Sequence, residues 1–142
     1  MKYLSGIYAL NLPCSLDTCG DWHSSAINWS SVPFNDSDNS VFKDYGIEKN
    51  REIWNHDGHV NVANHIRALL DLIAAGQFNL AQGMRDDFIC NDKYTSEIFK
   101  QVMLLKNSSL WQDIDRFMGS EYFSQWLRFK RNFYERSKHK DA

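Results

Sequence analysis

One stripe of apolar residues, between residues 62 and 73, constrains the fold of this chain more than any other feature. Its members recur at i, i+4, i+7, i+8 and i+11, which places them on one face of an α-helix: Val62, Ile66, Leu69, Leu70 and Ile73. Asn61 or Asn64 can cap the start of this helix, and Gly76 suits its end. We therefore expect a helix near residues 61–75, with its apolar face at the centre of the core.

The chain beyond this helix keeps the same periodicity. Apolar stripes predict three further helices, near residues 92–106, 110–118 and 120–136. Gly119 is expected to end or kink the second of these, and Ser120 to cap the third. Residues 61–136 should therefore form a helical bundle, and residues 137–142 a flexible tail.

The first 60 residues carry a different pattern. Apolar and aromatic residues within 3–10 predict a short strand, and the polar residues of 30–40 predict a loop. A second β region is expected within 41–59, where Asp57-Gly58 offers the chemistry of a tight turn. This part predicts a small β or irregular unit rather than a helical one.

Together these patterns predict the fold class. The chain has 142 residues, which is the usual size of one domain with its own core. We expect a single globular domain over residues 1–142, of the α+β class and α-rich. In it, a small N-terminal β or irregular cap (residues 1–60) would cover a C-terminal helical bundle.

The cysteines and the hydropathy pattern bear on the compartment. No apolar run approaches the roughly 18 to 20 residues that span a bilayer, and the N-terminus lacks the apolar region of a secretory signal. These features favour a cytoplasmic protein. The chain has an odd number of cysteines: Cys14, Cys19 and Cys90. Because no export signal is present, we expect them to be reduced thiols.

Cys14, Cys19 and His23 form the densest group of possible metal ligands. A structural zinc site needs four such ligands, and the fourth would have to come from Cys90, His56 or His59. The two cysteines are separated by four residues, whereas zinc sites most often use a gap of two. Buried structural cysteines are the favoured interpretation, so we expect no zinc here and no cofactor elsewhere.

The same stretch contains the residue types of a cysteine-dependent enzyme. Cys19 would be the nucleophile, His23 its base and Asp21 the group that orients the base. His65 is expected instead to be a hydrogen-bonded histidine near the edge of the core. The chain has no Walker-type loop and no GxGxxG, HExxH or GxSxG motif, which argues against the common enzyme classes.

Aromatic residues and charge point towards a partner-binding role. The aromatic share is 14%, and protein interfaces favour Trp, Tyr, Phe and Arg at their centres. We expect partner contacts from exposed members of this set: Trp22, Trp29, Trp54, Trp111, Arg128, Arg131 and Arg136. Residues 1–126 carry a formal charge of −6 and residues 127–142 a charge of +4. The basic C-terminal helix leaves nucleic-acid binding open as an alternative, although the overall pI near 6.2 makes strong binding by the chain alone unexpected.

Four segments resemble a known family: YLSGI (residues 3–7), ALNLPC (9–14), TCGDWH (18–23) and NVANHIRA (61–68). The chain is similar, from Tyr3 to about Phe129, to small uncharacterised bacterial proteins that are often encoded beside nucleotidyltransferase-like toxins of the abortive-infection type. The resemblance implies an antitoxin or phage-defence accessory protein that neutralises such a toxin by binding it. It supplies no site residues for these positions. A small cysteine- or metal-dependent enzyme, built on the Cys14, Cys19 and His23 region, is the alternative from another class.

Overall fold

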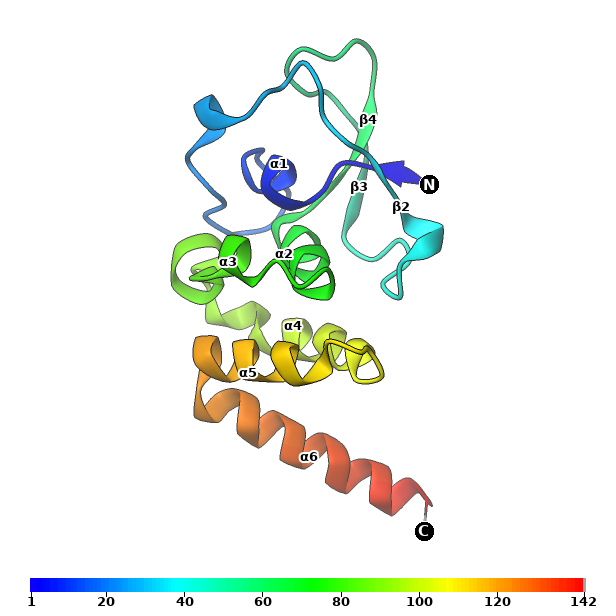
Figure 1. The fold of residues 1–142 in the computed structure, drawn as a ribbon, viewed down its shortest axis with the longest axis vertical. Coiled ribbons are helices and arrows are strands. Elements are labelled where there is room, and N and C mark those ends of the chain that lie inside the picture. The colour runs from blue at the N-terminus through cyan, green and yellow to red at the C-terminus, as the bar shows by residue number, and fades with distance from the viewer. Residues whose placement is uncertain (142) are drawn as a thin grey trace.

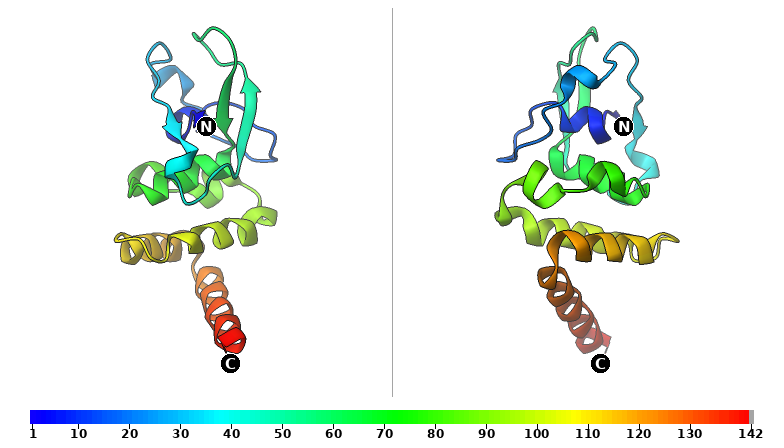
Figure 2. Two further views of the ribbon diagram at one scale, coloured as in Figure 1. Left: turned by 90° about the vertical axis from the view of Figure 1, so that its right-hand side faces the viewer. Right: turned by 60° about the vertical axis from the view of Figure 1, so that its left-hand side comes forward.

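The computed structural model describes the backbone of residues 1–141 and the side chains of residues 1–138. Along its longest axis the chain is arranged in layers: the N-terminal part, two layers of helices, and a long C-terminal helix (Figures 1 and 2). The predicted class is confirmed, because the chain is rich in helix, with two small antiparallel sheets near the N-terminus and helices towards the C-terminus.

Each of the two sheets contains a pair of antiparallel strands. They are β1 (Lys2–Tyr3) with β2 (Asn35–Asp36), and β3 (Ile47–Arg51) with β4 (Val60–Ala63). Leu4 connects them, since its N–H donates to the Asn61 carbonyl (2.9 Å) and its carbonyl accepts from the Ala63 N–H (2.8 Å). The β region expected within 41–59 is present only as β3, because β4 begins at Val60. The expected tight turn is wrong, since Asp57-Gly58 lies in a longer connection over residues 52–59.

The strand expected within 3–10 is wrong beyond Tyr3. Residues Gly6–Leu10 form a short helix, α1. Gly6 adopts φ +61°, a left-handed value that turns the chain into this helix. The Asn11 side-chain amide donates to the Ile7 carbonyl (2.7 Å), which satisfies an oxygen that so short a helix leaves unpaired. Ala9 and Leu10 are buried, and α1 packs against the helix that follows the sheets.

That helix is α2 (His65–Ala74), the predicted centre of the core. The Asn64 side chain accepts a hydrogen bond from the Arg67 N–H (2.8 Å) and caps it. The expected start at residue 61 is wrong, because residues 61–63 pair with β3 instead. Gly76 follows the helix at φ +75°, as expected of a C-terminal glycine.

The remaining elements form the helical layers. They are α3 (Phe78–Ala81), a π-helical turn (Met84–Ile89), α4 (Thr95–Val102), α5 (Trp111–Tyr122) and α6 (Ser124–Asp141), with 3₁₀ turns at 24–26, 37–39, 92–94 and 103–105. The predicted boundary at Gly119 is wrong: α5 continues through Gly119 and Ser120 to Tyr122, and the chain turns at Phe123, whose φ is +53°. Residues 137–141, which were expected to form a flexible tail, continue α6 as far as Asp141. Residue 142 lies outside the described residues.

Aromatic rings hold α4, α5 and α6 together. The ring centroid of Phe99 lies 4.9 Å from Tyr122, 5.1 Å from Trp126 and 5.3 Å from Phe129. Trp126 is fully buried, and its indole N–H donates to Asp115 (2.7 Å). One face of α6 is thus fixed to the body, which leaves its opposite face outward.

A buried arginine joins α2 to the N-terminal part. The Arg67 side chain has no exposed surface, and its Nε donates to Asp71 (3.0 Å). Its Nη1 donates to the carbonyls of Lys43 (2.7 Å) and Tyr45 (2.6 Å), and its Nη2 to the Tyr3 hydroxyl (2.8 Å). Because a buried cation is tolerated only with such partners, this network fixes the position of α2 beneath the sheets.

Candidate functional site

A pocket of about 460 Å³ opens where the loop after α1 crosses the start of α2. Two contacts anchor this loop. Ser15 donates from its N–H (2.8 Å) and its hydroxyl (2.5 Å) to the Glu48 carboxylate on β3, and the Asp17 N–H donates to the Tyr94 hydroxyl (2.9 Å). The lining includes Leu10, Leu12, Cys14, Thr18, Trp54 and His65.

Three side chains in this pocket form a connected chain of polar groups. The Cys14 sulfur lies 3.6 Å from the Thr18 hydroxyl oxygen, which lies 2.6 Å from Nδ1 of His65. On the other side of the ring, Nε2 of His65 lies 2.7 Å from the carbonyl oxygen of Leu12. Cys14 is half-buried and His65 is buried, so the pocket presents a thiol in front of a fixed imidazole.

The partners of His65 determine where its proton is. A carbonyl oxygen only accepts hydrogen bonds, so Nε2 must carry the hydrogen and donate it to Leu12. In the neutral ring Nδ1 therefore accepts from the Thr18 hydroxyl, whose oxygen can in turn accept from the Cys14 thiol. If the thiol proton moves to His65 through Thr18, both hydrogen bonds reverse and neither is lost.

The electrostatics of the pocket agree with this geometry. Burial raises the pKa of the Cys14 thiol, but the nearby His65 and the Thr18 hydrogen bond outweigh it and lower the pKa to about 7. Burial lowers the pKa of His65, but the Cys14 sulfur, the Leu12 carbonyl and the charge of Glu48 raise it above its ordinary value overall. Both shifts favour a thiolate beside an imidazolium.

Gly20 brings the backbone close to His65. Its φ is +70°, and a Cβ at this position would lie 2.6 Å from Cε1 of His65 and 2.9 Å from the Leu10 carbonyl oxygen. Any larger residue would therefore displace the imidazole from its partners.

Cys19 is not a free thiol in this structure. It forms a disulfide with Cys90, and their Cα atoms are 5.9 Å apart, a usual separation for such a bond. The expectation of three reduced thiols is therefore wrong for Cys19 and Cys90, and only Cys14 is free. The reason is tertiary: the N–H groups of Cys19 and Gly20 both donate to the Phe88 carbonyl (2.9 and 2.8 Å), which brings the loop against the turn that ends at Cys90.

The disulfide removes the nucleophile of the expected catalytic group. Asp21 and His23 do interact, with 2.5 Å between Oδ1 and Nδ1, but His23 is 81% exposed and Cys19 has no thiol to activate. Among the residues with described side chains, no group of three or more His, Cys, Asp or Glu could hold a metal ion. His65, which is distant from Cys14 in the sequence, takes the place expected for His23.

The four tryptophans expected at an interface differ in their exposure. Trp22 is 84% exposed and Trp54 is 51% exposed, and both lie on the lining of the Cys14 pocket. Trp29 is only 9% exposed; it packs edge-on against Trp54 (5.0 Å) and donates to the Ser24 carbonyl, so it offers no free ring to a partner. Trp111 is partly buried against the core.

The three arginines expected at an interface, Arg128, Arg131 and Arg136, are all exposed on α6. On the outward face of the helix, Leu127, Arg131 and Tyr134 follow one another at i, i+4 and i+7. Leu127 is 56% and Tyr134 is 45% exposed, and Phe123, immediately before the helix, is 65% exposed. We call these four residues the outer α6 face. Figure 2 shows α6 extending away from the layer of α4 and α5.

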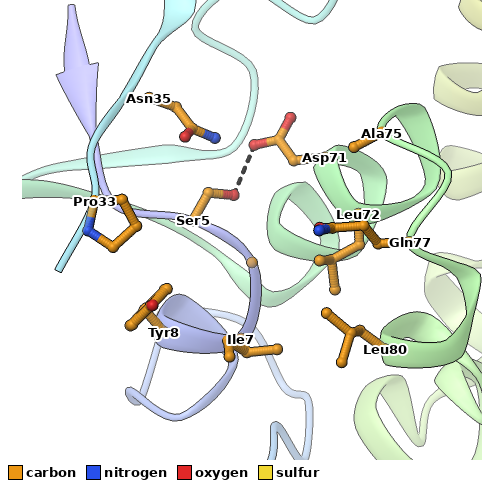
Figure 3. Close-up of a pocket in the computed structure, with 11 residues that line it drawn as sticks. Ser5, Ile7, Tyr8, Pro33, Asn35, Asp71, Leu72, Ala75, Gln77 and Leu80 are labelled. Carbon is orange, nitrogen blue, oxygen red and sulfur yellow. Dashed lines mark hydrogen bonds between the residues drawn. The ribbon is translucent and has the colours of Figure 1, made fainter. Parts of the chain in front are cut away.

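A second pocket, of about 400 Å³, lies between α1 and α2 (Figure 3). Its polar end contains Ser5, Asn35 and Asp71, and its apolar end includes Ile7 and Leu80. Asp71 accepts hydrogen bonds from the hydroxyls of Ser5 (2.6 Å) and Tyr3 (2.7 Å) in addition to that from Arg67. Because these groups bond to one another, they serve the fold rather than present a reactive atom.

Fold and site together define a small helix-rich α+β protein with one free, hydrogen-bonded thiol and an exposed aromatic and cationic helix face. No known protein family, no curated protein and no solved structure matches this chain. None of the described helices is long and apolar enough to cross a membrane.

Proposed function

We propose that this chain is a protein-binding module of the antitoxin type, which neutralises a nucleotidyltransferase-like toxin by direct contact. The observation that carries the proposal is the outer α6 face, where large apolar side chains and an arginine are held outward on a helix whose other face is packed into the core. The sequence resemblance to proteins encoded beside such toxins supplies the expected kind of partner.

The composition of the outer α6 face suits a protein interface. Exposed Phe, Leu and Tyr side chains expose apolar surface to water, and covering them releases that water favourably. Arg and Tyr are enriched at the centres of interfaces, where their flat side chains make both apolar and hydrogen-bonding contacts. The helix is fixed by Trp126 and Phe99, so little conformational freedom would be lost on binding.

Charge favours an acidic surface on the partner. Arg128 and Arg131 form no ion pair among the residues with described side chains, whereas the neighbouring Lys130 is paired with Asp115 (2.7 Å). Two unpaired guanidinium groups beside an apolar row would be complementary to carboxylates that border an apolar groove. We place the partner's contact on the outer α6 face, beside these two arginines.

Co-expression with the product of the neighbouring gene tests the proposal. The chain should restore growth to cells in which that product alone is toxic, and should co-purify with it. Leu127→Asp, in the outer α6 face, should abolish both effects. Leu104→Asp is the matched control, because Leu104 is similarly exposed (52% against 56%) but lies outside that face. A neighbour without toxicity, or rescue by the Leu127→Asp variant, would refute the proposal.

A further inference from the structure

The proposed function does not use the Cys14 pocket, although its groups are arranged for chemistry. Cys14 is the only free cysteine, it faces a cavity of about 460 Å³, and its sulfur is joined through Thr18 to a histidine whose tautomer is fixed. A buried cysteine that merely fills space needs neither the hydroxyl nor the imidazole.

From this geometry we infer that Cys14 is a nucleophilic thiol that forms mixed disulfides with small, uncharged disulfides bound between Trp22 and Trp54. The pocket is a covalent modification site, independent of the outer α6 face.

The reaction is a thiol–disulfide exchange, and its atoms and electrons balance. The Cys14 proton passes to the Thr18 oxygen while the Thr18 proton passes to Nδ1 of His65, which leaves a thiolate beside an imidazolium. The thiolate attacks one sulfur of the small disulfide, so a new S–S bond forms to Cys14 and the original S–S bond breaks. The departing thiolate leaves with the electron pair and takes the proton from His65 through Thr18. The small disulfide is the only oxidant required.

The lining of the pocket selects the reagent. Leu10, Leu12 and Pro13 provide apolar walls, and the indole rings of Trp22 and Trp54 offer surfaces on which a flat group can stack. Asp21 lies in the lining, so an anionic reagent would meet its negative charge, whereas the Glu48 carboxylate near His65 is paired with Arg51 (3.0 Å). A neutral aromatic disulfide therefore suits the pocket better than a dianionic one.

Stopped-flow kinetics with dithiodipyridine, a neutral aromatic disulfide that releases a coloured thiol, test this inference. At about pH 6, Cys14 should react several-fold faster than N-acetylcysteine, because more of it is thiolate. Cys14 should also react faster with dithiodipyridine than with dianionic dithiobis(nitrobenzoate), and this ratio of rates should be larger than the ratio for N-acetylcysteine. Peptide mass mapping should place the label on Cys14, and the Cys14→Ser variant should release no colour.

Thr18→Val keeps the shape of the side chain and removes the hydroxyl that links Cys14 to His65. Without this link the thiol pKa should rise, so the thiolate fraction at about pH 6 falls; greater nucleophilicity of the less acidic thiol offsets only part of that loss, and the rate should fall several-fold. Thr18→Ser, which restores the hydroxyl, should recover most of the rate. An unchanged rate in Thr18→Val, or a wild-type rate no greater than that of N-acetylcysteine, would overturn the inference. The outer α6 face variants should react normally, which separates this test from that of the proposed function.

Discussion

Replacing Asp71 by Asn should show how strongly the buried Arg67 network holds the N-terminal part on α2. The change keeps the side-chain volume. Among the described side chains, it removes the only negative charge bonded to the Arg67 guanidinium, which has no exposed surface. The new amide has a single oxygen, so its NH2 group must face either the hydroxyls of Tyr3 and Ser5 or the Arg67 guanidinium, all of which donate to Asp71.

The magnitude follows from the burial of the pair. Breaking a buried ion pair costs about 3 to 5 kcal/mol, and we expect the lower end because Asp71 is 12% exposed. A loss of about 3 kcal/mol in a chain of 142 residues corresponds to a fall in Tm of about 10 °C. Urea unfolding followed by circular dichroism gives the free energy of unfolding, and a thermal scan gives Tm.

Asp113→Asn provides the matched control. Asp113 pairs with Arg116 (3.5 Å) on α5, and both side chains are more than half exposed. Solvent screens such a pair, so its loss should change the free energy of unfolding by less than about 0.5 kcal/mol. An Asp71→Asn variant that loses no more than this control would show that the buried network does not hold the fold together.

Three further predictions concern other parts of the chain. Replacing Cys19 and Cys90 together by Ser should lower the free energy of unfolding, measured without reductant, by about 4 kcal/mol, because the disulfide closes a loop with a sequence separation of 71. Equal stability of the wild-type chain and this double variant would contradict the disulfide. Burial and the Asp71 hydrogen bond raise the pKa of Tyr3 to about 12, from about 10, so its contribution to stability is full below about pH 10 and is lost as the pH rises through about 12. Tyr3→Phe should reduce the loss of unfolding free energy at alkaline pH. A variant whose stability has the same pH dependence as the wild type would contradict this prediction. The chain alone should bind neither DNA nor RNA with submicromolar affinity at about 0.15 M salt, since its body is acidic; tight binding in a fluorescence titration, lost when the α6 cations become Gln, would contradict this.

The helical half could be predicted because local patterns determine it. The apolar stripe of α2 and the cap at Asn64 are both readable along a few residues, and so are the periodic stripes of α4, α5 and α6. The boundary between α5 and α6 could not be predicted, because the chain turns at Phe123, with a positive φ, rather than at the nearby Gly119. Packing of Trp126 and Tyr122 around Phe99 outweighs the usual backbone preference there.

The candidate site depends on contacts that no local pattern contains. Cys14 and His65 are brought together by the packing of the N-terminal loop on α2, and Cys19 meets Cys90 only because that loop also bonds to Phe88. Spacing along the sequence drew attention to His23, which lies near Cys19 in the chain but is exposed. The one available signal for His65 was its position directly after the capping Asn64, at the start of a buried helix, where a polar ring needs partners.

Calorimetric titration of the purified neighbouring toxin with this chain tests the central claim, direct binding through the outer α6 face. We predict a saturable complex of the wild-type chain, unchanged binding of the Leu104→Asp variant, and an affinity at least about a hundredfold weaker for Leu127→Asp, as loss of a central apolar contact would give. Absence of binding by the wild-type chain, or equal affinities of the two variants, would contradict the claim.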